Sequence, residues 1–144
     1  MELASCSFGQ SSKVSYLQML TAVCAVVNGG GLMQPYVVQR ITAPDGTIIK
    51  EVEPTVKRQV ISAETSATMC KLMERVVTKG TGTRAAVPGY RVGGKSGTSQ
   101  KLDSADEKAR IASFVAVAPI DDPQFLCLVC LDEPHSWTTA GGSL

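Results

Sequence analysis

Apolar positions follow a helical pattern in two stretches of the chain. Residues 16–27 are almost all apolar and come directly after Ser15, which has Gln18 three positions on, the spacing of a capping box. This pattern predicts a helix that is buried on most sides and ends at Asn28 and the glycines after it. A second apolar stripe with helical spacing begins after Ser62 and predicts a helix that extends to about Thr78.

β-branched and apolar runs predict the strands. Two of them flank Pro44, Asp45 and Gly46, which form a turn sequence, so we expect a hairpin arm of short and rather polar strands. Three more runs follow the second helix, at residues 90–99, 110–118 and 124–131. Only residues 119–123 join the last two, so these strands must be antiparallel if they pair. The predicted fold is α+β (mixed α/β), an antiparallel sheet with packed helices.

Composition narrows the functional classes. The chain has 144 residues, of which 44% are hydrophobic and 19% charged, and its net charge is +1. These values are typical of a single soluble globular domain and offer no basic surface for nucleic acid. The longest apolar run, 16–27, is too short to cross a bilayer, and no targeting segment is recognisable. Either the protein is cytoplasmic, or any targeting segment lies outside this chain.

The five cysteines do not predict a metal site. Cys127 and Cys130 have the C-x-x-C spacing, but they lie in a predicted strand, where residues three apart face opposite sides. No second pair could complete a site. We expect all five to be buried apolar thiols, and the sequence suggests no metal or other cofactor.

Residues 89–101 allow two interpretations. From Gly89 to Ser96 they match the phosphate-loop pattern G-x-x-x-x-G-K-[ST], and the apolar run 125–131 before Asp132 and Glu133 resembles a Walker B strand. A phosphate loop needs a helix that opens at its Lys-Ser pair. Gly97 interrupts such a helix at once, and the antiparallel constraint does not suit the mainly parallel core of that fold. A P-loop nucleotide binder is therefore only a remote alternative.

The second interpretation places Lys95, Ser96, Gly97 and Thr98 on a strand at the edge of a sheet. Ser96 and Thr98 then project from one face about 6–7 Å apart, where both hydroxyls could donate to a ligand carboxylate. Gly97 leaves room for the ligand, and Lys95 supplies positive charge that attracts anions or lowers the pKa of a neighbouring group. A backbone N–H on this edge could stabilise an oxyanion.

Motifs around this strand resemble the penicillin-binding transpeptidases, particularly the high-molecular-weight class B type. They are SFGQ at 7–10, SYLQ at 15–18, VNGG at 27–30, LMQP at 32–35, VVTKGTG at 76–82, VPGYRVGGKSGTSQK at 87–101 and SFVAVAP at 113–119. The resemblance implies a partial penicillin-binding, β-lactamase-like fold, with Lys95, Ser96 and Gly97 as the third active-site motif and Lys95 as its catalytic residue. It also implies that Ser96 and Thr98 bind the ligand carboxylate and that the Thr98 N–H belongs to the oxyanion hole.

The chain departs from the family in two motifs. None of its lysines has a serine three residues earlier, so Ser-x-x-Lys is absent. Its one asparagine is Asn28, and the residue two positions earlier is Val26 and not serine, so Ser-x-Asn is absent too. We expect residues 1–144 to be the C-terminal part of one transpeptidase domain, without the nucleophile and the final helix. The isolated chain is then inactive, because no acyl-enzyme forms without the nucleophile.

The resemblance also implies a substrate, ligands and a location for the whole protein. The whole protein would be a D,D-transpeptidase that acts on peptidoglycan stem peptides ending in D-Ala-D-Ala and binds β-lactams. It would be anchored to the cell membrane and work on its extracytoplasmic face. The isolated chain is expected to self-associate through exposed apolar surface and bare strand edges. The alternative is a non-catalytic module of the same fold that binds a ligand or partner.

Overall fold

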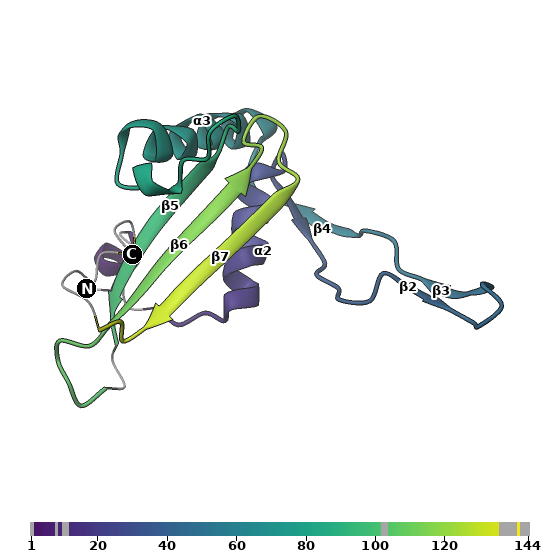
Figure 1. The fold of residues 1–144 in the computed structure, drawn as a ribbon, viewed down its shortest axis with the longest axis horizontal. Coiled ribbons are helices and arrows are strands. Elements are labelled where there is room, and N and C mark those ends of the chain that lie inside the picture. Colours follow the sequence, from purple (N-terminus) through teal and green to yellow (C-terminus); the bar gives the residue numbers. More distant parts are fainter. Residues whose placement is uncertain (1, 8, 10–11, 102–103, 136–140, 142–144) are drawn as a thin grey trace.

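The computed structural model describes residues 2–7, 9, 12–101, 104–135 and 141 (Figure 1). Its helices and strands are α1 (Glu2–Cys6), α2 (Tyr16–Val27), β1 (Gly31–Met33), β2 (Arg40–Thr42), β3 (Ile48–Glu51), β4 (Val56–Gln59), α3 (Ala63–Lys79), the 3₁₀ turn η1 (Thr83–Ala85), β5 (Gly93–Gln100), β6 (Arg110–Ala118) and β7 (Phe125–Asp132).

Both long helices begin where the capping residues predict. The Ser15 hydroxyl accepts a hydrogen bond from the Gln18 N–H (3.2 Å), and the Gln18 side chain accepts one from the Ser15 N–H (2.8 Å). This reciprocal pair satisfies two donors that the first turn of α2 leaves without intrahelical partners. Ser62 caps α3 through the Thr65 N–H (3.1 Å). The predicted helices and the capping box are confirmed.

The main sheet contains three antiparallel strands in the order β5-β6-β7. Val115 pairs with Lys95 on one side and with Leu128 on the other, so the register follows the chain without a bulge. One face of β6 and β7 packs against α2 and α3, which lie behind the sheet and across its upper end in Figure 1. The core there consists of Val27, Met73, Val115, Val117 and Ile120. The antiparallel pairing predicted from the short 119–123 connection is confirmed.

The second face of this sheet, called the open face below, is exposed along β7 among the described residues. Phe125, Val129 and Leu131 are 74%, 52% and 41% exposed on it. The accessible surface totals 10371 Å², whereas a compact monomer of 15.2 kDa has about 7,100 Å². The chain therefore exposes far more surface than a closed domain of its mass.

Helix α2 is less buried than its apolar sequence predicts. Tyr16, Leu17 and Met19 are all exposed, and only Ala25 and Val27 are fully buried. The expectation of burial on most sides is wrong, because the described residues cover mainly the C-terminal half of α2 and leave its first turns exposed.

The predicted hairpin is present and projects as an arm (Figure 1). Strands β2 and β3 pair antiparallel, Asp45 accepts a hydrogen bond from the Thr47 N–H (2.9 Å), and Gly46 has a φ of 85°. β2 and β3 have three and four residues and are shorter than the runs 36–41 and 47–52 that predicted them. At the base of the arm, β1 pairs antiparallel with β4, a two-stranded sheet that the sequence did not predict.

The expectation that all cysteines are buried is wrong. Cys6 and Cys127 are exposed, whereas Cys24, Cys70 and Cys130 are half-buried, and all five are free thiols. Burial alternates along β7, which puts Cys127 and Cys130 on opposite faces as their spacing predicts. Within the described ranges, no three His, Cys, Asp or Glu side chains gather as a metal site. None of the described helices combines the length and apolar character needed to cross a bilayer.

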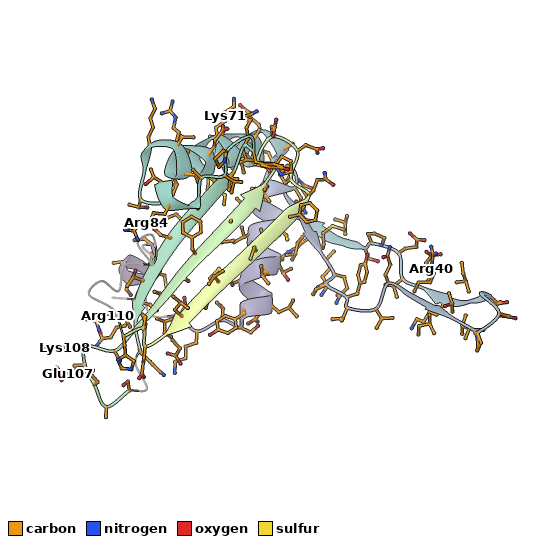
Figure 2. The ribbon with its side chains drawn as sticks, in the orientation of Figure 1. Arg40, Lys71, Arg84, Glu107, Lys108 and Arg110 are labelled. Carbon is orange, nitrogen blue, oxygen red and sulfur yellow. The ribbon has the colours of Figure 1, made fainter. Side chains whose placement is uncertain are left out.

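Charged side chains of both signs are spread over the molecule. Figure 2 shows Arg40 on the arm, Lys71 on α3, and Glu107, Lys108 and Arg110 together near the β5–β6 connection. In Figure 2 these labelled groups do not form a single basic patch.

Candidate active site

The Lys95–Thr98 segment lies in β5, at the edge of the main sheet. β5 runs from Gly93 to Gln100 and pairs only with β6 among the described strands. No helix opens at Lys95. The phosphate-loop interpretation is therefore wrong, because its lysine and serine are in extended backbone within an antiparallel sheet.

Strand alternation divides the four motif residues between the two faces of the sheet. Ser96 pairs with Phe114 and Thr98 with Ala112, so both hydroxyls project from the open face. The Lys95 side chain leaves the backbone on the opposite face, and a side chain at Gly97 would lie on that face too. The Lys95 side chain bends back to the edge, where its Nζ donates to the Ser96 carbonyl oxygen at 2.5 Å.

The space beside Gly97 is limited by the neighbouring strand β6, whereas the sequence suggested a limit set by a ligand. A Cβ at this position would lie 2.6 Å from the Ser113 Oγ on the neighbouring strand. Glycine therefore fits here because Ser113 occupies the adjacent space on the same face, whereas the sequence suggested room for a ligand.

The backbone of β5 presents alternate groups to the sheet edge. The Lys101 N–H donates to the Ala109 carbonyl oxygen at 3.0 Å, which makes this a hydrogen-bonded pair of the antiparallel ladder. Because bonded and non-bonded pairs alternate, the N–H and C=O groups of Ser96 and Thr98 turn away from β6. These groups face the sheet edge.

Both hydroxyls of the motif have contacts that the sequence did not predict. The Ser96 Oγ lies 3.1 Å from the Thr81 Oγ1, and either hydroxyl can donate. The Thr98 Oγ1 accepts a hydrogen bond from the Gly141 N–H, also at 3.1 Å. Thr81 lies within the VVTKGTG motif, but that motif alone did not indicate a contact with β5.

Close packing around Phe114 holds Thr81 next to Ser96. A Cβ on Gly82 would lie 2.9 Å from the Phe114 ring, and one on Gly94 would lie 2.6 Å from it. The N–H groups of Gly80 and Gly82 both donate to the Val76 carbonyl oxygen, at 3.1 and 3.0 Å. The turn after α3 is thus held against β6 by the contact between Gly82 and the Phe114 ring.

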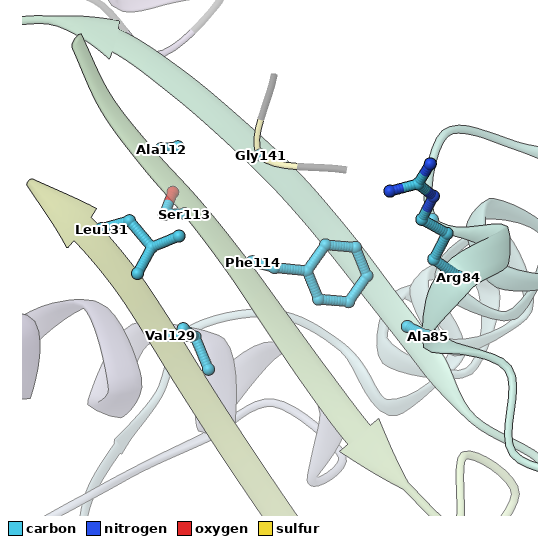
Figure 3. Close-up of a pocket in the computed structure, with 9 residues that line it drawn as sticks. Arg84, Ala85, Ala112, Ser113, Phe114, Val129, Leu131 and Gly141 are labelled. Atoms are coloured by element: carbon cyan, nitrogen blue, oxygen red, sulfur yellow. The ribbon is translucent and has the colours of Figure 1, made fainter. Parts of the chain in front are cut away.

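An apolar cavity of about 250 Å³ lies on the same face of the sheet (Figure 3). Its lining residues are Gly82, Arg84, Ala85, Ala112, Ser113, Phe114, Val129, Leu131 and Gly141. None of the four motif residues lines it, so the cavity adjoins the β5 motif and does not contain it.

Ion pairs fix both ends of β5. Arg91, just before the strand, forms a two-pronged pair with Glu74 of α3 (2.7 and 2.9 Å) and also contacts Asp121 (3.0 Å). The hydrogen bond from Arg91 lowers the pKa of Glu74.

At the other end of β5, Lys101 bridges two acids that end β7. Its Nζ lies 2.8 Å from a Glu133 oxygen and 2.9 Å from an Asp132 oxygen. Hydrogen bonds to Glu133 and then to Asp132 raise the pKa of Lys101, which therefore stays protonated.

Comparison with known proteins identifies the family. The model of the penicillin-binding protein transpeptidase domain matches residues 1–144. The chain belongs to this family. Relatives include stage V sporulation protein D of Bacillus subtilis, 42% identical over all of this chain and 23% of the relative. Another is a probable peptidoglycan D,D-transpeptidase FtsI of Caulobacter vibrioides, 38% identical over 92% of this chain and 23% of the relative. The chain thus spans about a quarter of the length of these relatives.

Solved transpeptidase structures have the same fold. The apo transpeptidase domain of Burkholderia pseudomallei penicillin-binding protein 3 matches with a TM-score of 0.76 and 36% identity, over 98% of this chain and 41% of that chain. Penicillin-binding protein 3 of Mycobacterium tuberculosis, complexed with aztreonam, matches with a TM-score of 0.81 and 30% identity, over 92% of this chain and 32% of that chain. The predicted partial transpeptidase fold, mixed helix and antiparallel sheet, is confirmed.

Proposed function

We propose that this chain supplies the substrate-binding strand of a D,D-transpeptidase that cross-links peptidoglycan stem peptides by serine acyl transfer. The observation that carries the proposal is the placement of Ser96 and Thr98 on one face of β5, the edge strand of the main sheet among the described strands. Two hydroxyls at this spacing can donate to the carboxylate of a D-Ala-D-Ala peptide or of a β-lactam. The names of the relatives, several of them peptidoglycan D,D-transpeptidases, support the same substrate class.

In this proposal Lys95 is the catalytic residue of the chain. Its ammonium group lies at the sheet edge beside the Ser96 carbonyl oxygen. There it attracts the anionic substrate and favours the deprotonated form of a neighbouring hydroxyl or amine. The Thr98 N–H, which is directed away from β6, is suited to donate to the oxyanion of the tetrahedral intermediate. Gly97 lets β5 pair closely with β6, because a Cβ there would lie 2.6 Å from the Ser113 Oγ.

The attacking serine belongs to another part of the whole protein. These 144 residues contain neither Ser-x-x-Lys nor Ser-x-Asn. The serine Oγ would form an ester with the penultimate D-Ala and release the terminal D-Ala, and an amino group of a second stem peptide would then displace the serine. The chain by itself, as the C-terminal part of the domain, is therefore inactive.

The reaction also sets the proposed location. Stem peptides are components of the cell wall, so the enzyme would act on the extracytoplasmic face of the cell membrane, tethered by a segment outside this chain.

The isolated chain would associate with a second copy of itself through β7. The Glu133 N–H donates to the Arg110 carbonyl oxygen, so Leu126, Leu128 and Cys130 direct their N–H groups to the outer edge of the sheet. No proline or charge interrupts the strand before Asp132. An edge without these protections is a template for strand pairing.

Reaction with a labelled penicillin tests the function. The whole protein is expected to be labelled covalently on a serine outside this chain, whereas residues 1–144 alone remain unlabelled. Labelling of the isolated chain would contradict its proposed inactivity. A whole protein that is not labelled would favour the alternative, a non-catalytic binding module of the same fold.

A further inference from the structure

The contact between Thr81 and Ser96 joins two elements that are distant in sequence. Thr81 follows α3 in the turn between Gly80 and Gly82, and its Oγ1 lies 3.1 Å from the Ser96 Oγ. Gly82 approaches the Phe114 ring so closely that a side chain there would collide with it. Two backbone bonds to the Val76 carbonyl oxygen fix the same turn. The packing therefore holds the Thr81 hydroxyl within hydrogen-bond distance of Ser96, although Thr81 itself is exposed.

We infer that Thr81 is a positioning residue for carboxylate recognition by Ser96. The inference rests on the proposed function, since it concerns the same site. A serine hydroxyl has one hydrogen to donate and can accept at the same time. When Thr81 donates to the Ser96 Oγ, the Ser96 hydrogen is available for the ligand carboxylate. The opposite orientation would direct that hydrogen to Thr81.

A bound carboxylate selects the productive orientation because it accepts hydrogen bonds and cannot donate them. The resulting chain runs from Thr81 to Ser96 to the ligand, and each bond polarises the next. Without the Thr81 hydroxyl, the Ser96 side chain loses its internal donor and its hydrogen has no fixed direction. The loss should weaken binding of the carboxylate more than it slows the acylation step.

The test compares Thr81→Val and Thr81→Ser in the whole protein that contains this chain. Acylation by a penicillin is followed by intact-protein mass spectrometry, and its concentration dependence separates apparent affinity from the limiting acylation rate. Thr81→Val should reduce acylation efficiency about three- to tenfold, mainly through affinity, because it removes one hydrogen bond. Thr81→Ser keeps the hydroxyl and should restore most of the efficiency. Thr78→Val is the matched control and should have no effect, because the Thr78 hydroxyl donates to the Glu74 carbonyl oxygen within α3.

A penicillin methyl ester distinguishes positioning from a structural role. The ester lacks the charged carboxylate, so Thr81→Val should react with it at the wild-type rate. An unchanged efficiency of Thr81→Val toward the free acid would overturn the inference. Equal losses toward acid and ester, or equal losses in the valine and serine variants, would also overturn it. If the wild-type protein is not acylated, the proposed function fails and the inference fails with it.

Discussion

At the scale of single residues, the packing of the Phe114 ring requires glycine at positions 82 and 94. A Cβ on Gly94 would lie 2.6 Å from the ring and 2.8 Å from the Val115 carbonyl oxygen. Gly94→Ala should therefore destabilise the chain by about 1–3 kcal/mol, the usual cost of overpacking. Gly31→Ala is the matched control, since its nearest neighbour would be 3.7 Å away. Urea unfolding at one protein concentration measures both. Equal stability of the two variants would contradict the packing argument.

The same scale shows what the sequence could predict of the site. Strand alternation was enough to put Ser96 and Thr98 on one face, because it depends only on neighbouring residues. The contacts of Thr81 with Ser96 and of Gly141 with Thr98 join residues 15 and 43 positions apart. Such contacts depend on how the turn after α3 and the chain end pack on the sheet, which no local pattern encodes. The roles assigned to Lys95, Ser96, Gly97 and Thr98 stay predictions.

At the scale of elements, Arg91 links α3, the start of β5 and the β6–β7 turn. Glu74→Gln should lower the stability at pH 7 by about 1 kcal/mol or less, because Arg91 is 56% exposed. The pKa of Glu74 is lowered from its ordinary value of 4.5 in the folded state. Its contribution is therefore complete above that value and is lost as the pH falls through the lowered folded-state pKa.

Thermal unfolding of wild type and Glu74→Gln from pH 7 to pH 2 measures this difference, which should shrink in acid. Glu53→Gln, on the arm, is the control and should match wild type throughout. A difference between wild type and Glu74→Gln that does not change with pH would contradict the ion-pair account.

Local signals also explain which elements the sequence predicted. Serine caps at Ser15 and Ser62, the Pro-Asp-Gly turn and the long apolar runs lie within single elements, and each predicted a helix, hairpin or strand that is present. β1 and β4 were not predicted. They have three and four residues, too few to show an alternation of apolar and polar positions. Their pairing joins residues on either side of the arm, which no local pattern indicates.

At the scale of the whole molecule, the open face and edge of β7 predict self-association. Val129→Lys should reduce it by placing a charge on the exposed apolar face, where Val129 is 52% exposed. Val37→Lys is the control, because Val37 lies outside the main sheet and is already 99% exposed. Sedimentation equilibrium over a range of concentrations measures both. A wild-type chain that is monomeric at every concentration would contradict the prediction.

The proposed carboxylate site on β5 is tested most directly by the rate at which a labelled penicillin acylates the whole protein. The measurement compares wild type with the Ser96→Ala, Thr98→Val double variant. Two hydrogen bonds to a charged group are lost, so acylation efficiency should fall about a hundredfold or more, while the thermal stability stays close to that of wild type. Acylation of the double variant at the wild-type rate would contradict the assignment of Ser96 and Thr98 as the residues that bind the carboxylate.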